Sequence, residues 1–241
     1  MALFGKKKEK EEAAAPCGVV IPAAGSAQRM GGMDKLTLEL GGEAVLVRAI
    51  RPFQQSELVR EIVVVTRSDR IAQVAKLCRD AGLSKVLAVT EGGETRTESV
   101  LLGVRKLSKK VQLAAVHDGA RPLVSQQIVE DTIRRAQVCN AAAPAVPVHD
   151  TIKVAEGDLV TDTPDRKTLY AVQTPQVFDR DLLEAALTKA LADGVELTDD
   201  CQAVERLGMH VHLTQGSERN LKLTTPIDLV LANALLAEGT A

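Results

Sequence analysis

Two cations in one loop of small residues are the first sign of chemistry in this chain. An apolar run at residues 19–21 leads into a loop rich in glycine and alanine, which carries Arg29 and, six positions later, Lys35. Small residues let backbone N–H groups approach an anion closely, and the two cations would neutralise its charge. The pattern predicts a binding site for a polyphosphate.

Two common nucleotide-binding motifs are absent from this loop. No Gly-Lys-[Ser/Thr] follows Gly25, so the loop is not a P-loop. It also lacks Gly-x-Gly-x-x-Gly, and the second apolar run ends in Thr66 and Arg67 without the acidic residue that would bind a ribose. A nicotinamide-dependent dehydrogenase is therefore disfavoured.

The composition limits the possible partners. Aromatic residues make up 2% of the 241 residues and Trp is absent, which disfavours base stacking on single-stranded nucleic acid. A formal net charge of −2 gives no general basic field to attract DNA or an anionic lipid surface. The four cysteines lie far apart without C-x-x-C spacing, so we expect neither a zinc site nor a disulfide framework.

The first 16 residues differ from the rest of the chain. Residues 6–12 are all Lys or Glu, and nothing near them forms the apolar region of a secretory signal. No stretch elsewhere approaches the roughly 20 apolar residues of a membrane span. We therefore predict a solvated, disordered tail over residues 1–16 of a cytoplasmic protein that has no membrane partner.

Residues 17–148 alternate between short runs rich in valine and alanine and longer helical patterns. Continuous apolar runs are typical of strands that are covered on both faces, and consecutive parallel strands need crossover connections. We predict a single α/β domain over residues 17–241, with a doubly wound, mostly parallel Rossmann-like sheet and helices on both of its faces.

Residues 150–172 interrupt this alternation. Residues 151–154 and 167–170 read as two short strands on either side of a polar turn around Gly157. Such a thin hairpin has no core of its own and should pack on something, for which a second subunit is one candidate. The pattern predicts a protruding β-hairpin arm.

Several loops should meet at one edge of the sheet. In a doubly wound sheet, ligands bind beyond the carboxyl ends of the strands. Besides the first loop, residues 91–94, 117–122 and 148–151 lie at such ends. We therefore expect these loops to form one site.

The same loops carry an ordered set of motifs. The set consists of Pro22-Ala23-Ala24-Gly25, Arg29-Met30-Gly31, Lys35, residues 91–100, residues 117–122, Asp150-Thr151, Thr174-Pro175-Gln176 and residues 220–224. Together and in this order, they resemble the 2-C-methyl-D-erythritol 4-phosphate cytidylyltransferase family over residues 17–237. One block alone is weak evidence, whereas the ordered set is specific.

The resemblance implies a reaction between CTP and methylerythritol phosphate in non-mevalonate isoprenoid biosynthesis, giving CDP-methylerythritol and pyrophosphate. A phosphate oxygen of the acceptor would attack the α-phosphorus of CTP in line, so positioning and electrostatic stabilisation would carry the catalysis. It also implies Mg²⁺ on the phosphates, with Asp118 as a metal ligand. Since no acid–base step needs His117, we interpret that residue as structural.

The resemblance assigns residues to three roles. Arg29 and Lys35 would be catalytic, as transition-state stabilisers. CTP would be bound by Pro22, Ala23, Ala24, Gly25, Gly93, Glu94, Ser99, Asp118 and Gly119. Methylerythritol phosphate would be bound by Arg121, Thr151, Arg166, Thr174 and Lys222. Thr151 and Arg166 would reach from the arm into the partner subunit of a homodimer.

Two alternatives remain open. A ribitol-5-phosphate cytidylyltransferase resembles the same family and would share the loops that bind CTP. A non-catalytic nucleotide-binding module could keep the fold without turnover, although Arg29, Lys35 and Lys222 count against it. The first loop also departs from the family pattern, because Ala27 stands where glycine is frequent.

Overall fold

The structure is a computed structural model that describes residues 15–24 and 38–239. Its centre is an 8-stranded sheet in the order β10-β7-β11-β6-β1-β4-β5, with β12 also paired to β7. Four strands form the parallel half, namely β1 (Cys17–Pro22), β4 (Val59–Thr66), β5 (Val86–Glu91) and β6 (Leu113–Val116). The other half contains β7 (Ala141–Pro147), β10 (Tyr170–Val172), β11 (Gln176–Asp179) and β12 (His212–Gln215).

The predicted mostly parallel, doubly wound sheet is confirmed, with one addition. Strand β11 lies between β6 and β7 and runs antiparallel to both. Its four residues are too short to stand out as an apolar run, and the sequence did not predict it. This insertion brings Thr174 and Gln176 next to the end of β6.

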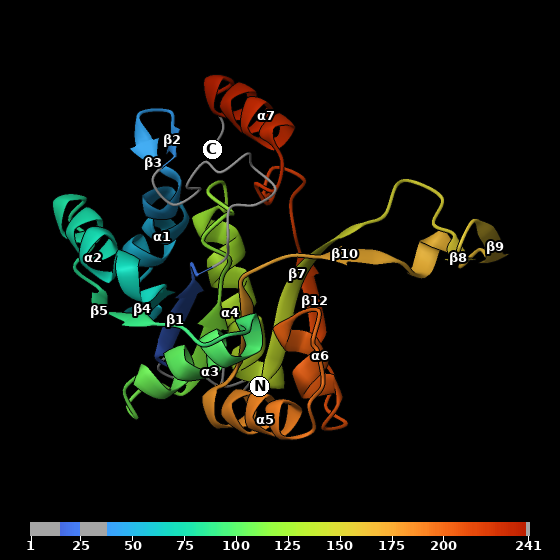
Figure 1. Ribbon diagram of the computed structural model, residues 1–241, viewed down its shortest axis with the longest axis horizontal. Helices are drawn as coiled ribbons and strands as arrows, with labels where there is room; N and C mark the ends of the chain where they lie inside the picture. Colours follow the sequence, from blue (N-terminus) through green and yellow to red (C-terminus); the bar gives the residue numbers. More distant parts are fainter. Residues whose placement is uncertain (1–14, 25–37, 240–241) are drawn as a thin grey trace, which may run out of the picture.

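Helices cover both faces of the sheet (Figure 1). One face carries α1 (Val45–Gln55), α2 (Ile71–Asp80) and α4 (Gln126–Cys139), and the other carries α3 (Arg96–Lys106), α5 (Arg180–Ala192) and α6 (Asp200–Glu205). Alternate residues of β1 divide between the two cores, with Val19 and Ile21 in the first and Val20 in the second. Ser68 begins a short 3₁₀ helix, η2 (Ser68–Arg70), that precedes α2.

A third, smaller core lies beside the carboxyl ends of the parallel strands. It joins β2 (Glu39–Leu40), β3 (Glu43–Ala44) and α7 (Pro226–Ala237) through buried Leu40 and Leu223. Helix α7 begins with the capping box of Thr225 and Asp228, in which the Asp228 carboxylate accepts the Thr225 N–H at 2.6 Å. Within the described residues, no helix has both the length and the apolar character that a membrane crossing requires.

The arm is present, but its strands differ from those predicted. The hairpin consists of β8 (Val154–Glu156) and β9 (Leu159–Asp162), which turn at Gly157 with φ of 63°. Residues 166–168 form a 3₁₀ helix, η3 (Arg166–Thr168), and the chain then returns to the main sheet as β10. The predicted pair of strands at residues 151–154 and 167–170 was wrong. The turn at Gly157 pairs β8 with β9, which lie directly on either side of it. Figure 1 shows the hairpin extending away from the body of the molecule.

His117 is fully buried at the end of β6, in agreement with a structural role. Its ring packs on Phe53 of α1, with 4.9 Å between ring centroids. Nε2 lies 3.2 Å from the Arg121 carbonyl oxygen, which can only accept, so Nε2 carries the proton. Nδ1 then accepts from the Thr174 hydroxyl at 2.9 Å. Burial lowers the pKa of His117 from 6.5 to about 4.

This lowered pKa predicts a pH-dependent stability. Below pH 6.5 the unfolded chain binds a proton that the folded chain does not, so the stability that neutral His117 contributes is complete above pH 6.5 and declines as the pH falls towards 4. The slope should be about 1.4 kcal/mol per pH unit. We expect the difference in unfolding free energy between the wild type and His117→Gln to shrink from pH 7 to pH 4.5 in urea titrations.

His210→Asn, which replaces an exposed histidine, provides the control variant for the same urea titrations. A stability difference between wild type and His117→Gln that stays constant with pH would contradict this assignment.

Candidate active site

The loops that follow β1 and β6 meet at the carboxyl ends of these strands, as the sequence predicted, and the loop after β1 also bonds to the end of β4. The Gly119 N–H donates to the Pro22 carbonyl oxygen at 3.5 Å, and the Ala23 N–H donates to that of Val65 at 2.7 Å. Gly119 is buried against Ala23, where an added Cβ would lie 3.6 Å from the alanine methyl group. The floor of the site is therefore a continuous surface formed by Pro22, Ala23 and Gly119.

Part of the predicted polyphosphate loop lies outside the described residues. Ala24 follows the floor and is half-buried, whereas Gly25, Arg29 and Lys35 fall among residues 25–37. Their roles stay predictions.

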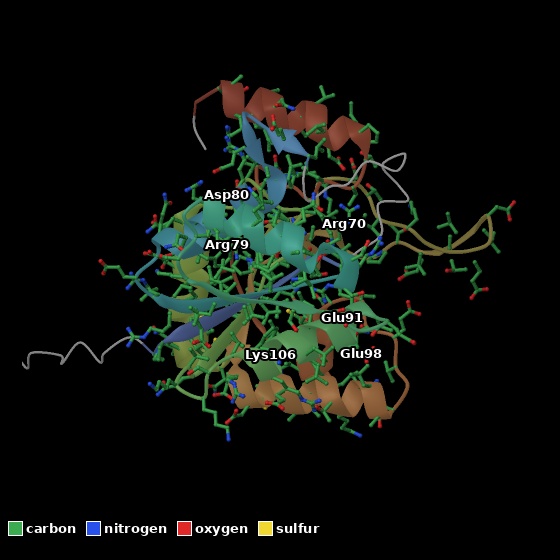
Figure 2. The ribbon with its side chains drawn as sticks, turned by 60° about the vertical axis from the view of Figure 1, so that its left-hand side comes forward. Arg70, Arg79, Asp80, Glu91, Glu98 and Lys106 are labelled. Carbon is green, nitrogen blue, oxygen red and sulfur yellow. The ribbon has the colours of Figure 1, made fainter. Side chains whose placement is uncertain are left out.

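Residues 92–95, which we call the base loop, connect β5 to α3. The Gly93 N–H donates to Ser99 Oγ at 3.1 Å, and the Glu94 N–H donates to Glu98 Oε2 at 2.8 Å. Thr95 caps the helix, because its Oγ1 accepts the Glu98 N–H at 3.1 Å. The base loop is therefore held by the first turn of α3. Figure 2 shows Glu98 at this end of the helix and Lys106 at the other.

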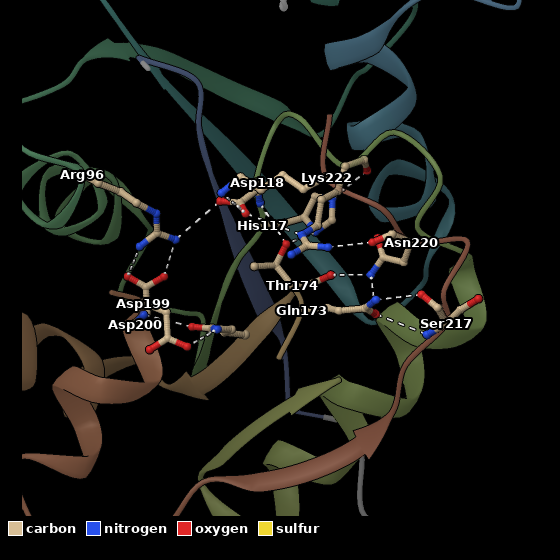
Figure 3. Close-up of polar contacts among 12 residues, drawn as sticks. Arg96, His117, Asp118, Gln173, Thr174, Asp199, Asp200, Ser217, Asn220 and Lys222 are labelled. Carbon is tan, nitrogen blue, oxygen red and sulfur yellow. Dashed lines mark hydrogen bonds and ion pairs between the residues drawn. The ribbon is translucent and has the colours of Figure 1, made fainter. Parts of the chain in front are cut away.

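Asp118 lies at the centre of the site and is 8% exposed (Figure 3). Its Oδ2 is 2.9 Å from Lys222 Nζ and 3.6 Å from Arg121 Nε, and its Oδ1 is 3.6 Å from Arg96 Nη2. Burial alone would raise the pKa of this carboxyl, but Lys222 and Arg96, with a smaller contribution from Arg121, lower it to about 2. Asp118 is therefore an anion at neutral pH.

The segment that carries Lys222 is fastened to the loop that carries Asp118. Arg121 Nη1 donates to the Asn220 carbonyl oxygen at 2.7 Å, and the Leu223 N–H donates to that of Ala120 at 2.8 Å. Asn220 is fully buried, and its Nδ2 donates to the Thr174 carbonyl oxygen at 2.9 Å. These contacts fix the backbone around Lys222, while its side chain stays 44% exposed and can meet a ligand.

Thr174 supports the site from below. It is 4% exposed, and its hydroxyl accepts the Asp118 N–H at 3.1 Å while it donates to His117 Nδ1. The hydroxyl proton is therefore already used inside the protein. The structure places Thr174 beneath Asp118, and its predicted contact with substrate stays a prediction.

Two predicted residues lie apart from this cluster. Thr151 and Arg166 are exposed on the arm, and Arg166 Nη1 donates to the His149 carbonyl oxygen at 2.6 Å. Within the described residues, no hydrogen bond or ion pair joins either side chain to Asp118 or Lys222. The chain alone thus brings together Asp118, Arg121 and Lys222 but not the arm residues.

Sequence reasoning missed a second buried ion pair in the site. Arg96 donates through Nη1 and Nη2 to the two carboxylate oxygens of Asp200 at 3.0 and 2.7 Å (Figure 3). Asp200 is 1% exposed and lies 104 positions along the chain from Arg96. An arginine in the motif block at residues 91–100 was visible, but no local pattern indicated its partner.

The described residues contain no group of three or more His, Cys, Asp or Glu side chains that could hold a metal ion by themselves. Asp118 is one carboxylate beside three cations. A site of this kind suits Mg²⁺ only where substrate phosphates supply further oxygen ligands, which is how that ion is commonly bound. Three cations face two carboxylates in the cluster, so it also suits an anionic ligand.

Comparisons with known proteins agree with the motif order. The family described as "IspD: 2-C-methyl-D-erythritol 4-phosphate cytidylyltransferase" matches residues 17–238. A protein of that name from Symbiobacterium thermophilum is 44% identical over 225 residues, which cover 92% of this chain and 94% of the relative. Another from Caldanaerobacter subterraneus subsp. tengcongensis is 42% identical over 224 residues, with 90% of this chain and 97% of the relative covered.

Solved structures show the same similarity. The crystal structure of 4-diphosphocytidyl-2C-methyl-D-erythritol synthase from Anaerococcus prevotii superposes with a TM-score of 0.83 at 30% identity, covering 93% of this chain and 97% of that one. The 2-C-methyl-D-erythritol 4-phosphate cytidylyltransferase from Thermus thermophilus gives a TM-score of 0.73 at 33% identity, with 90% and 98% covered. Fold, site and sequence together show that this chain belongs to the 2-C-methyl-D-erythritol 4-phosphate cytidylyltransferase family.

Proposed function

We propose that this protein transfers the cytidylyl group of CTP to 2-C-methyl-D-erythritol 4-phosphate and releases pyrophosphate, as a step in isoprenoid biosynthesis. The observation that carries the proposal is Asp118, a buried anion beside the carboxyl ends of the parallel strands that is shared by cations from three separate segments of the chain. The membership of the chain in the family supports the choice of substrates.

In the proposed reaction, a phosphate oxygen of the acceptor forms a bond to the α-phosphorus of CTP while the bond from that phosphorus to the bridging oxygen breaks. Lys222 is suited to hold the acceptor phosphate, because its side chain is 44% exposed beside Asp118, and the mostly buried Arg121 adds positive charge next to it. The base loop, with Gly93 and Glu94, would bind cytidine through backbone groups, together with Ser99 in the first turn of α3. Arg29 and Lys35 would stabilise charge on the departing pyrophosphate.

A divalent metal fits this arrangement. Asp118 Oδ1 lies 3.6 Å from Arg96 Nη2, which is longer than a hydrogen bond, so this contact leaves lone pairs of the oxygen for an ion. Mg²⁺ bound to Asp118 and to the phosphates of CTP would offset their negative charge during transfer. The chain itself orients the carboxylate, because Lys222 pairs with its Oδ2 and Thr174 accepts the backbone N–H of Asp118.

The arm supports a homodimer as the active form. Its apolar side chains are strongly exposed, with relative values of 47% for Val154, 68% for Leu159 and 53% for Val160. Exposed apolar residues gathered on a thin hairpin are typical of a surface that another chain covers. Thr151 and Arg166 would then enter the site of the partner subunit. We place the enzyme in the cytoplasm, where its nucleotide substrate would be available.

Pyrophosphate release separates this proposal from its alternatives. We expect release from CTP upon addition of methylerythritol phosphate, with Mg²⁺ present. Release with ribitol 5-phosphate alone would instead indicate the ribitol enzyme. No release with either acceptor, together with measurable CTP binding, would indicate a nucleotide-binding module.

Replacing Lys222 tests the acceptor site. Lys222→Ala removes the cation 2.9 Å from Asp118 and should lower kcat/KM for methylerythritol phosphate about 100-fold or more, while KM for CTP changes little. Steady-state kinetics with each substrate varied in turn would measure both effects. The matched control is Lys189→Ala, which removes an exposed lysine paired with Asp193 on α5 and should leave the kinetics unchanged. Equal loss in both variants would contradict the assignment.

Mixing two inactive variants tests whether the arm acts in trans. Lys35→Ala and Arg166→Ala would each inactivate a homodimer. If Arg166 serves the partner, a mixed dimer combines one doubly damaged site with one intact site, so activity should return upon subunit exchange. The measurement is pyrophosphate release by dimers that carry two different affinity tags. Absence of recovery in verified mixed dimers would show that Arg166 serves its own subunit.

A further inference from the structure

Arg96 is the first residue of α3 and directly follows the base loop. It has neither a catalytic nor a binding role in the function proposed above. Its guanidinium is nevertheless committed to a buried carboxylate, because Asp200 accepts from both terminal nitrogens in a planar fork. Such a pair fixes the orientation as well as the position of the arginine.

The far side of this pair is itself anchored. Gln176 on β11 accepts the backbone N–H groups of Asp200 and Cys201 through Oε1, at 3.0 and 3.1 Å. Its Nε2 donates to Asp199 Oδ2 at 2.8 Å. Gln176 is 2% exposed, so the first turn of α6 is tied to a strand of the central sheet. Arg96 is therefore held by a rigid support.

The contacts close into a ring that passes through Asp118. Arg96 Nη2 lies 3.6 Å from Asp118 Oδ1, and the Asp118 N–H donates to the hydroxyl of Thr174, two residues before Gln176. The ring thus runs from Asp118 through Arg96 and Asp200 to Gln176, and back along the chain through Thr174 to Asp118. Figure 3 shows Arg96, Asp200, Asp118 and Thr174 of this ring. Oδ1 of Asp118 faces Arg96 on the side of the base loop, and Oδ2 faces Lys222 on the other side.

We propose that Arg96, held by Asp200, is a positioning residue that fixes the base loop relative to the Asp118 carboxylate. The inference rests on the proposed function, because that function makes the base loop the binding site of cytidine and Asp118 the carboxylate beside its phosphates. A shift of the first turn of α3 would move Gly93 and Glu94 with it, since Ser99 and Glu98 of that turn hold their N–H groups.

Asp200 has a second effect in this arrangement. It neutralises Arg96 inside the protein, so this arginine does not serve as a free cation for phosphate. Within the described cluster, Lys222 is then the most exposed cation that can meet an incoming anion, because Arg121 is 12% exposed and donates to the Asn220 carbonyl oxygen. Arg96 acts through geometry, and its loss should affect the nucleotide more than the acceptor.

The test compares Arg96→Gln with a matched control on the same helix. Arg105 lies near the other end of α3 and pairs with Glu184 of α5 at 3.1 Å, so Arg105→Gln also removes an arginine that links α3 to another helix. Pyrophosphate release gives kcat and the KM of each substrate, and thermal unfolding reports stability. Titration calorimetry with CTP and Mg²⁺, without acceptor, gives nucleotide affinity independently of turnover.

We expect Arg96→Gln to weaken CTP binding and raise its KM at least about tenfold and to lower kcat, with the acceptor KM within about twofold of wild type. Arg105→Gln should leave all three constants within about twofold of the wild type. Arg96→Lys keeps the charge without the fork and should recover only part of the loss. Unchanged CTP affinity in Arg96→Gln, or an equal rise in both KM values, would overturn the proposal.

Asp200 provides the second arm of the test. Asp200→Asn should weaken CTP binding as Arg96→Gln does, and the double variant should be no worse than the more damaged single variant, because the two residues act as one unit. Additive losses would overturn the proposal. If Arg96→Gln does not fold, Arg96→Lys and the double variant decide the same question.

If the wild type releases no pyrophosphate, the proposed function fails instead. Calorimetry of the same variants then still decides whether Arg96 positions the base loop.

Discussion

The site depends on one shared anion. The carboxylate of Asp118 is buried, so it must be paired, and its partners come from its own loop (Arg121), from the start of α3 (Arg96) and from a segment about 100 residues further on (Lys222). Each cation also has a second contact that holds it in place. Arg96 pairs with the buried Asp200 carboxylate, and Arg121 donates to the Asn220 backbone carbonyl oxygen. Lys222 lies on a backbone segment that is fixed by hydrogen bonds. The three cations are therefore held close to one another before any ligand binds. A polyanionic ligand then meets positive charges that are already in place.

The sequence predicted the parts of this site that local patterns encode. Apolar runs identified the parallel strands, and Asp118 could be placed at their edge because the carboxyl ends of parallel strands meet there. The pairing of Arg96 with Asp200 could not be predicted, because it depends on α6 packing against β11. The sequence did not predict the antiparallel strand β11 for a similar reason. Its four residues form a strand because they pair with β6 on one side and with β7 on the other.

The arm shows a different limit of prediction. Its existence followed from the break in strand and helix alternation, but the pairing within it follows from Gly157, which adopts a positive φ and brings adjacent residues together. The body of the molecule holds Arg121 and Lys222 in place, whereas Arg166 contacts only the base of its own arm among the described residues. This difference agrees with a site in which one chain supplies the fixed residues Arg121 and Lys222.

The long separation between Arg96 and Asp200 also has a consequence for the order in which the protein is made. The arginine leaves the ribosome 104 residues before its carboxylate partner, and Arg121 precedes Asn220 by 99 residues. The parallel strands β1, β4, β5 and β6 can pair earlier, whereas the ion pair that ties Arg96 to α6 cannot form until Asp200 has been synthesised. Contacts of such high sequence separation form slowly. The nascent chain can therefore pair its four parallel strands before it can complete the contacts of Arg96 and Arg121 with the later part of the chain.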